Sequence, residues 1–547
     1  MSQPFELQIE LGSGECREIP LAGNHRSLAD LLGAHGLPLN TRCGQRGLCR
    51  GCEVELRAGS LSVEGGQINA PALVQACRAR IISGPAKIHV PARSRKEHRP
   101  QVGETFEIAV PYAHEPLFPF VAGGRDTAFA VDVGTTTVVV LLVDLSTGEV
   151  LSRAGAFNEQ IRFGDNVITR IEAAGTPEKL SALQRAIVTE TIQPQLLRAC
   201  ERAGRPVARI AGGAIAGNTT MLHLLVGTDP TPLGSAPFTP RFIAGRQILA
   251  AEIGLTAKGL APETPIQLLP GIAAYIGADI TAGIFACGMV FDSSPSLLVD
   301  IGTNGEIVLQ SGGQLTACAT AAGPAFEGCG LSSGTRARDG AVSDLKLALN
   351  PFQLETKVIG DVPLVRAGGI CGSAYVDFLA TARSTGLLGK TGRFEMSAWE
   401  KVPPQNRLAE AGERALRLTE TNGASALRIS EVDVALLLQA KAAIGAGIEI
   451  LLEKAGLRAA DLGRGYLAGG FGLHLDVAHA IAIGLLPGFG AEQVRVVGNT
   501  SLAGALVALV DRTTLPAMEN LRAQVEVIEL NRADDFEDRY IENLMLP

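Results

Sequence analysis

Residues 128–151 read AFAVDVGTTTVVVLLVDLSTGEVL: an apolar strand ending in Asp-x-Gly-Thr, a tight turn, a second apolar strand, a glycine turn and a third strand. Residues 296–316, SLLVDIGTNGEIVLQSGGQLT, repeat this pattern. Helix and strand material follows each copy, including the stretches RIAGGAIAG, GYLAGGFG and VRVVG. The repeat therefore predicts two related α/β lobes with a cleft between them.

The tips of the two repeats carry residues suited to phosphate. A glycine turn with threonine hydroxyls and backbone N–H groups makes an anion cradle, and an Asp at a strand end can hold Mg2+ or orient an attacking water. A third turn, Gly469-Gly470, lets a flat base or ribose approach the backbone. Each piece alone would also suit a hairpin turn or a helix start. The candidates at the two tips are Asp132, Gly134, Thr135 and Thr136, and Asp300, Gly302, Thr303 and Asn304.

These three motifs together resemble the two phosphate motifs and the adenosine motif of the actin, hexokinase and heat-shock chaperone ATPases. The resemblance implies that ATP lies between the lobes, with the two tips at the phosphates and metal and Gly469 and Gly470 along the adenosine. It also implies that Asp132 and Asp300 serve catalysis. The chain has no G-x-x-x-x-G-K-S/T loop, in agreement with a different way of binding phosphate.

A second constellation lies near the N-terminus. Residues 41–52, TRCGQRGLCRGC, place Cys43, Cys49 and Cys52 in a C-x5-C-x2-C pattern, and Cys77 follows downstream. Four thiolates suffice for a [2Fe–2S] cluster, which is our interpretation. A structural zinc site is the alternative, but such sites usually use two C-x-x-C pairs. Four unrelated free cysteines are the second alternative.

The spacing and the strand pattern of the first ninety residues resemble adrenodoxin- and putidaredoxin-type ferredoxins. That resemblance implies a β-grasp fold. Before the cysteine loop, Ser27 is placed to cap a helix through LADLLGAHG, with Gly36 at its end. After Cys77, ARIISG and KIHVP are expected to be closing strands.

The domain organisation follows from these motifs. We expect a [2Fe–2S] ferredoxin domain over residues 1–92 and a charged, proline-punctuated linker over 93–126 that runs over a surface. Residues 127–547 should form the actin-like ATPase domain, with lobes over roughly 127–290 and 291–547. The fold class is thus α/β and α+β in several domains, which suits a length of 547 residues.

Composition and charge limit the cellular location and the kinds of partner that we expect. No run of eighteen uninterrupted apolar residues occurs, and the N-terminus reads as a strand, so we expect no membrane span and a cytoplasmic protein. Residues 1–100 hold 13 Lys and Arg against 9 Asp and Glu, although the whole chain carries a net charge of -8. The net positive charge of residues 1–100 weakly favours a partner with an acidic docking surface. Aromatic residues do not interleave with the basic ones, so nucleic acid is not expected.

A [2Fe–2S] ferredoxin joined to this ATPase resembles the reductive activators of corrinoid-dependent proteins, and the resemblance covers nearly the whole chain. Some relatives carry an extra domain before the ATPase, which the sequence here leaves no room for. Five further stretches resemble that family: AIAGNTTMLHLLVG, GIAAYIGADITAG, ATAAGPAFEG, GGICGSAYVD and VVGNTSLAGA.

The family resemblance implies a function. The protein would pass one electron to a Co(II) corrinoid protein, restoring Co(I) for methyl transfer, and ATP would be consumed. An upstream reductase would supply the electron, and a homodimer is left open. The alternatives are an ATP-dependent activator of another metalloenzyme, as for the 2-hydroxyacyl-CoA dehydratases, an ATP-sensing ferredoxin module with little turnover, and a small-molecule kinase.

Residues 316–328, TACATAAGPAFEG, form a small, apolar segment directly after the second repeat. One hypothesis is that this segment presses on the corrinoid protein and reports the nucleotide state to it. The alternative is a buried loop that packs the lobe. A bulky side chain at Ala322 would distinguish the two.

Overall fold

The computed structural model describes most of the chain, in two compact units. One unit comprises residues 1–101 and 327–437, and the other comprises residues 102–326 and 438–547. Cys43 and Cys49 lie outside the described residues. These are 6–11, 15–20, 27–39, 52–63, 66–91, 94, 106–110, 112, 114–360, 362–410, 412–419, 426–470 and 475–547.

The N-terminal residues form a sheet in the order β2-β1-β6-β3-β4, with β5 paired to β3. The first and last of these strands in the chain, β1 and β6, pair in parallel, and the other pairings are antiparallel. The two closing strands expected after Cys77 are in fact one continuous strand, β6. The strands are β1 (Glu6–Leu11), β2 (Cys16–Pro20), β3 (Glu53–Val63), β4 (Gly66–Asn69), β5 (Ala72–Gln75) and β6 (Ala79–Val90).

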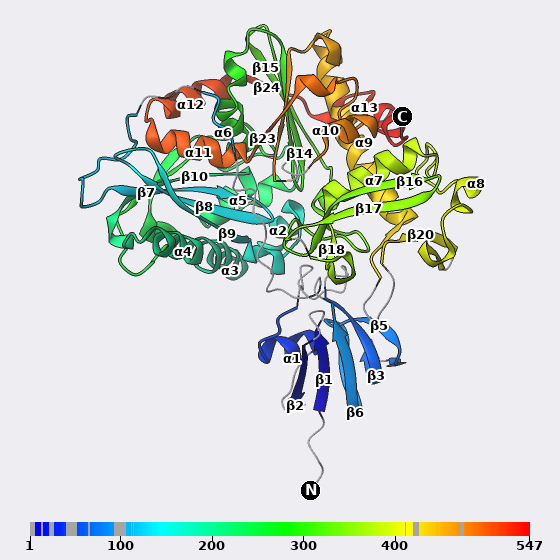
Figure 1. The fold of residues 1–547 in the computed structure, drawn as a ribbon. Helices are drawn as coiled ribbons and strands as arrows, with labels where there is room; N and C mark the ends of the chain where they lie inside the picture. The colour runs from blue at the N-terminus through cyan, green and yellow to red at the C-terminus, as the bar shows by residue number, and fades with distance from the viewer. Residues whose placement is uncertain are drawn as a thin grey trace. The chain divides into compact units, whose positions relative to one another are not determined.

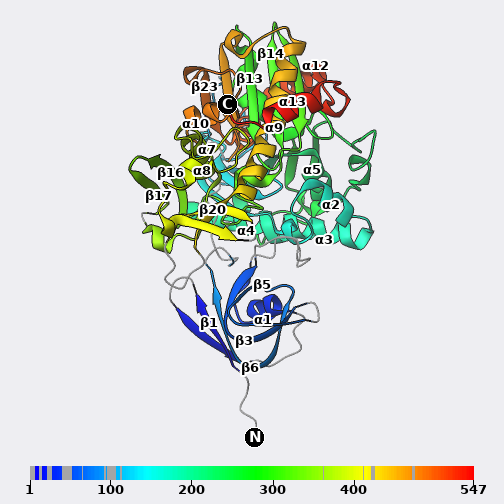
Figure 2. The ribbon, with the colours of Figure 1, turned by 90° about the vertical axis from the view of Figure 1, so that its right-hand side faces the viewer.

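One helix, α1 (Leu28–Ala34), covers a face of this sheet, as Figure 2 shows. The hydroxyl of Ser27 accepts a hydrogen bond from Asp30 N at 3.1 Å, which confirms the predicted cap. Leu28 and Leu32 of the helix are buried with Leu7 of β1 in one apolar core. Burial of this face holds the helix on the sheet.

The second unit contains the first repeat as an antiparallel meander, β7-β8-β9, which adds β10 and β12 in parallel on the β7 side (Figure 1). The order is β11-β12-β10-β7-β8-β9. These strands are β7 (Thr127–Val133), β8 (Thr137–Asp144), β9 (Val150–Phe157), β10 (Ile210–Gly217), β11 (Arg246–Leu249) and β12 (Pro265–Leu268). The helices between them are α2 (Val167–Ala173), α3 (Pro177–Ile187), α4 (Gln193–Ala203) and α5 (Thr219–Leu225).

The second repeat builds a sheet of the same design, in the order β23-β22-β13-β14-β15-β24. Again a meander of three strands, β13-β14-β15, adds two parallel strands beside its first strand. This duplicated strand order confirms the internal repeat. The strands are β13 (Ser296–Ile301), β14 (Gly305–Ser311), β15 (Gln314–Thr320), β22 (Arg464–Ala468), β23 (Val494–Gly498) and β24 (Val525–Val527).

A helix follows the last parallel strand of each repeat, and these two helices, α6 (Ala278–Ala286) and α11 (Thr500–Val510), pack against each other. Small residues make the close approach possible. A Cβ on Gly504 would come within 2.5 Å of Ala282, and one on Gly283 within 2.7 Å of the Thr500 hydroxyl. The remaining helices of this unit are α10 (Val477–Ala482), α12 (Thr514–Gln524) and α13 (Phe536–Asn543).

Residues 327–437 carry two small sheets, in the orders β17-β16-β18 and β19-β20-β21, and α7 packs against β16. Their elements are β16 (Ala341–Leu349), β17 (Phe352–Val358), β18 (Gly369–Ile370), α7 (Gly372–Ser384), α8 (Met396–Trp399), β19 (Arg407–Glu410), β20 (Glu413–Arg417) and β21 (Arg428–Ser430). The long helix α9 (Glu431–Lys454) leads out of this segment. It is long and apolar enough to cross a membrane, but 78% of its apolar window is buried, as in the core helix of a soluble protein.

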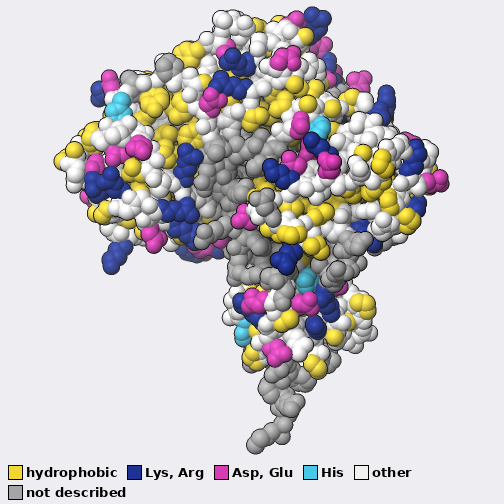
Figure 3. Space-filling view, in the orientation of Figure 1, with side chains coloured by type: hydrophobic (Ala, Val, Ile, Leu, Met, Phe, Trp, Pro, Cys, Tyr) yellow, Lys and Arg dark blue, Asp and Glu magenta, His cyan; other side chains and the backbone are white. Residues whose placement is uncertain are grey.

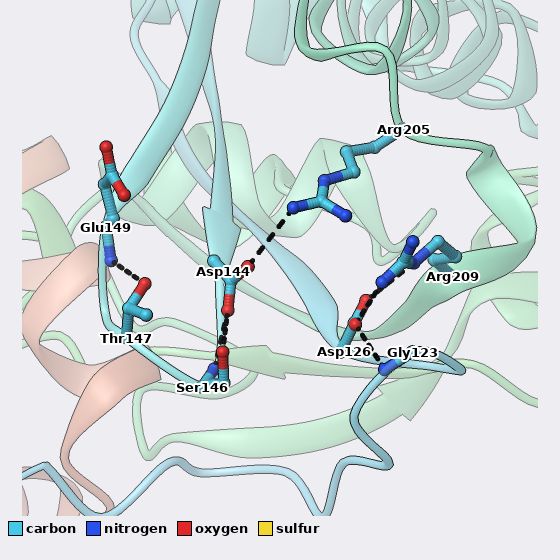
Figure 4. Close-up of polar contacts among 8 residues, drawn as sticks. All are labelled: Gly123, Asp126, Asp144, Ser146, Thr147, Glu149, Arg205 and Arg209. Carbon is cyan, nitrogen blue, oxygen red and sulfur yellow. Dashed lines mark hydrogen bonds and ion pairs between the residues drawn. The ribbon is translucent and has the colours of Figure 1, made fainter.

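The segment expected as a linker is attached to the second unit over its described part. Val110 and Phe118 are buried in the core of the first repeat. Its end is fixed by Asp126, whose carboxylate accepts hydrogen bonds from Arg209 Nε at 2.8 Å and Gly123 N at 3.0 Å (Figure 4). Asp144, the last residue of β8, lies opposite Thr127 and faces Arg205 at 3.6 Å in the same view.

The structure describes the surroundings of the segment 316–328 and the distribution of charge on one face of the molecule. The first residues of the segment 316–328 belong to strand β15, and Ala322, Ala325 and Phe326 are buried. That burial favours the packing alternative for this segment. On the face seen in Figure 3, the basic side chains lie among acidic ones over the described residues and form no single-sign stripe.

Candidate nucleotide and cluster sites

Asp132 lies near the end of β7, where its half-buried carboxylate is held by the start of α11. Asn499 Nδ2 donates to one oxygen at 2.8 Å and Ser501 Oγ donates to the other at 2.7 Å. Burial raises the pKa of Asp132, and the two hydrogen bonds oppose that rise. A helix that follows the second repeat therefore fixes the acid of the first repeat.

Asp300 occupies the matching place on β13, and its surroundings are acidic. It lies opposite Glu306 of β14 in the antiparallel register. Burial, followed by the charge of Asp132, raises the pKa of Asp300 to about 7. Gly469 lies directly against it, since a Cβ there would come within 2.9 Å of an Asp300 carboxylate oxygen.

A fourth carboxyl group joins this cluster from the start of α6. Burial raises the pKa of Asp279, and the nearby charges of Asp300 and then Asp132 add to the rise. Burial, together with Asp279 and Asp300, raises the pKa of Glu306 in the same way. The oxygens of these four carboxyl groups are the ligand type that Mg2+ prefers, but no three of the groups have ligand oxygens within 4.8 Å of one another.

The two predicted phosphate tips meet in space. The hydroxyl oxygens of Thr136 and Thr303 lie 3.2 Å apart. The neighbouring Thr135 hydroxyl accepts a hydrogen bond at 2.9 Å from the side chain of Asn218, which caps α5. The structure thus brings together residues from both repeats that the sequence pattern assigned to one site.

Buried polar side chains hold the backbone of the first tip, the turn that follows β7. Asn158 donates through its side chain to Gly134 O at 3.0 Å and through its backbone to Thr136 O at 2.9 Å. Arg170, which is fully buried, donates to Thr135 O at 2.5 Å and to Gln160 Oε1 at 3.1 Å. These bonds fix the backbone carbonyls of the loop that carries Gly134, Thr135 and Thr136.

The described cysteines of the N-terminal constellation lie together. Cys52 directly precedes β3 and Cys77 follows β5, and these strands pair with Glu53 opposite Gln75. Ala76 N donates to Cys52 O at 3.1 Å, which brings the two chain segments into contact. Both thiols are buried and neither forms a disulfide. This arrangement fits two ligands of a shared metal group.

Four site residues were not singled out from the sequence: Asp279, Glu306, Asn499 and Ser501. Glu306 lies within the second repeat, and the others lie in the stretches GIAAYIGADITAG and VVGNTSLAGA that resemble the corrinoid activators. A usable signal was present, because Asp279, Asn499 and Ser501 each lie at a helix start following a strand, where functional groups gather in α/β folds.

Comparisons with known proteins agree with this site. Residues 127–292 match the family described as RACo middle region, and residues 294–547 match the C-terminal domain of RACo, the ASKHA domain. The corrinoid activation enzyme RamQ of Eubacterium limosum is 33% identical over 429 residues, which cover 76% of this chain and 70% of that protein. The chain belongs to the family of reductive activators of corrinoid proteins. Residues 294–547 therefore carry an ATPase domain of the actin and hexokinase type.

Two more members of this activator family are similar. The Methanosarcina barkeri protein named [Co(II) methylated amine-specific corrinoid protein] reductase is 27% identical over 414 residues, covering 71% of this chain and 70% of its own length. A solved structure titled reductive activator for corrinoid, iron-sulfur protein superposes with a TM-score of 0.73 at 28% identity, and covers 99% of this chain and 98% of its own. Family membership separates this chain from the kinase and dehydratase-activator alternatives.

Proposed function

We propose that this protein passes one electron from an N-terminal [2Fe–2S] cluster to a Co(II) corrinoid protein, restoring Co(I) for methyl transfer, and that ATP binding and hydrolysis drive the step. The observation that carries the proposal is the 33% identity to a corrinoid activation enzyme over most of both chains. The four-carboxylate cluster beside two glycine-threonine tips supports the part played by ATP.

The cluster would be held by Cys43, Cys49, Cys52 and Cys77. The adjacency and burial of Cys52 and Cys77 support this assignment, and the C-x5-C-x2-C spacing supplies the other two thiolates. The β-grasp arrangement expected of a ferredoxin is supported by the parallel β1–β6 pair with α1 across the sheet. When bound, the group supplies one-electron redox chemistry.

The nucleotide would lie along the two tips. Gly134, Thr135 and Thr136 would meet its phosphates from the first repeat, and Gly302, Thr303 and Asn304 from the second. The adenosine would lie along Gly469 and Gly470. Asp300, with Asp279 and Glu306, would hold Mg2+, and Asp132 would orient water at the phosphates. A bound Mg2+ supplies positive charge that stabilises the charge developing on the phosphoryl group.

ATP is needed because reduction of Co(II) by a ferredoxin cluster is thermodynamically uphill. Binding that favours one cobalt state shifts its effective potential, by about 59 mV per tenfold ratio of affinities for a one-electron couple. Two lobe arrangements with different affinity for the corrinoid protein would let ATP supply that ratio. The electron itself would come from a separate reductase, and the reaction would take place in the cytoplasm.

The test is anaerobic reduction of a Co(II) corrinoid protein followed by its visible spectrum. We expect Co(I) to appear only with reduced activator and ATP together, and ATP hydrolysis to rise when the Co(II) protein is added. Reduction at the same rate without ATP would contradict the coupling. ATP hydrolysis that ignores the corrinoid protein, with no Co(I) formed, would contradict the function.

A further inference from the structure

The segment that follows the N-terminal domain lies on the strand–helix junction that holds Asp132. We call residues 106–118 the connector; its described residues are 106–110, 112 and 114–118. At its start, Phe106 forms a β-bridge with Gly498, the last residue of β23. Glu107 N donates to Val497 O at 3.2 Å, and the Glu107 carboxylate pairs with Arg495, whose Nε lies 2.9 Å away.

The connector then contacts both crossing helices near their C-terminal ends. Ala109 N donates to Ala286 O, the last residue of α6, at 2.9 Å. Leu117 N donates to Leu509 O of α11 at 2.9 Å. Beyond α11, Arg512 N donates to Glu115 O at 2.8 Å. The connector is therefore bonded to the strand before α11, to α6 and to the far end of α11.

Asn499 directly follows Gly498, the residue that bridges to the connector. At Asn499 the connector comes close to the proposed nucleotide site. Asn499 and Ser501 hold the two oxygens of the Asp132 carboxylate. The same Asn499 caps α11, since its Oδ1 accepts from Leu502 N at 2.9 Å. The residue whose side chain fixes Asp132 therefore directly follows the backbone that pairs with the connector.

We infer that Asn499 and Ser501 are positioning residues that link the Asp132 side of the nucleotide site to the connector. A change in the position of Asp132 on nucleotide binding or hydrolysis shifts the start of α11, and the backbone pairing at Val497 and Gly498 passes that shift to the connector. The ion pair of Asp126 with Arg209 fixes the chain beyond the connector to the first sheet (Figure 4). The shift is therefore felt toward the N-terminal domain, which precedes the connector in the chain.

This linkage rests on the proposed function in placing the nucleotide at Asp132 and the electron-carrying group in the N-terminal domain. Its test needs no corrinoid protein. Backbone amide exchange is measured by mass spectrometry on the full chain with its metal group, without nucleotide, with Mg-ADP, and with a non-hydrolysable Mg-ATP analogue. The amides of Glu107, Ala109 and Leu117 are the reporters, because each has a defined partner.

In the unmodified protein we expect exchange of the connector peptides to differ by about fivefold or more between the ADP and ATP-analogue states, within the usual range of site coupling. Ser501→Ala should reduce that difference to less than half while the protein still binds nucleotide. Ser501→Thr, which keeps the hydroxyl, should restore it. Asn499→Ala should act in the same direction as Ser501→Ala and also loosen the start of α11.

Asn166→Ala is the matched control. Asn166 also caps a helix, with Oδ1 accepting from Thr169 N at 2.9 Å, and that helix, α2, packs against α5 of the first repeat. This variant should keep the nucleotide-dependent difference. The inference is overturned if Ser501→Ala leaves the difference intact, or if the unmodified protein binds nucleotide with no change in connector exchange. Failure to bind nucleotide at all would instead contradict the proposed function.

Discussion

The hydroxyl oxygens of Thr136 and Thr303 lie 3.2 Å apart although 167 residues separate them in the chain. Each belongs to the tip of one repeat, directly after the strand that carries Asp132 or Asp300. The contact places the two tips over a common point, so a phosphate group held by one tip is within reach of the other.

Asp132→Asn and Asp300→Asn should each reduce ATP turnover by a factor on the order of 100 or more, because each would remove a carboxylate from the proposed phosphate and metal site. Steady-state hydrolysis with Mg-ATP is the measurement. The visible spectrum of the N-terminal metal group is the control and should be unchanged. Unaltered turnover in both variants would show that the nucleotide site is assigned wrongly.

The acidic cluster should make stability depend on pH in a way that Mg2+ reverses. The pKa of Asp300 is raised to about 7 in the folded chain from an ordinary value of 3.8. Between these pH values Asp300 is protonated in the folded chain but ionised in the unfolded chain. The stabilisation from the protonated Asp300 is therefore complete below about pH 4 and is lost as the pH rises toward 7. Without metal, the melting temperature should fall over that range.

Asp300→Asn supplies the comparison, because an amide does not titrate. The difference in melting temperature between the unmodified protein and this variant should shrink as pH falls with chelator present. Added Mg2+ competes with the proton, so its apparent affinity should increase with pH up to about 7. A Mg2+ affinity that is flat from pH 5 to 8 would argue against metal binding at this cluster.

Anaerobically purified protein should be red-brown with about two irons per chain. Cys49→Ser and Cys77→Ser should each lose the visible chromophore, since a four-thiolate site loses one ligand. Cys200→Ser is a matched control, as that thiol is buried in the core of the first repeat and should keep the colour. Stoichiometric zinc without iron would favour the zinc alternative.

Ala322→Trp should lower the free energy of unfolding by about 1–3 kcal/mol, because Ala322 is only 8% exposed and the new ring has no space. Thermal melting is the measurement. The docking hypothesis for this segment predicts the opposite pattern. A variant that melts like the unmodified protein but binds the Co(II) protein more weakly would support docking.

Much of the fold was predictable because short stretches of the sequence determine many of its elements. The two copies of Asp-x-Gly-Thr, each between apolar strands, gave both meanders, and Ser27 gave the start of α1. Such signals depend only on neighbours in the chain. The continuity of β6 was missed since Ser83-Gly84-Pro85 in its middle reads as a turn.

The site was predictable to the extent that it lies on those patterns. Asp279 and Ser501 were missed for a topological reason: each helix start belongs to one repeat but faces the acid of the other. That exchange arises from the crossing of α6 and α11, which no local pattern records. The contacts of the connector could not be predicted from local patterns either. Its partners, such as Gly498 and Leu509, lie almost 400 residues further along the chain.

The parallel pairing of β1 with β6 has a consequence for synthesis of the protein. β1 is translated well before its parallel partner, which is complete only when residues 86–90 have been made. Cys43 and Cys49 are translated between these events. The β1–β6 pair therefore forms after all four cysteines have been made, so a metal group bound by them would be inserted into a nearly complete domain.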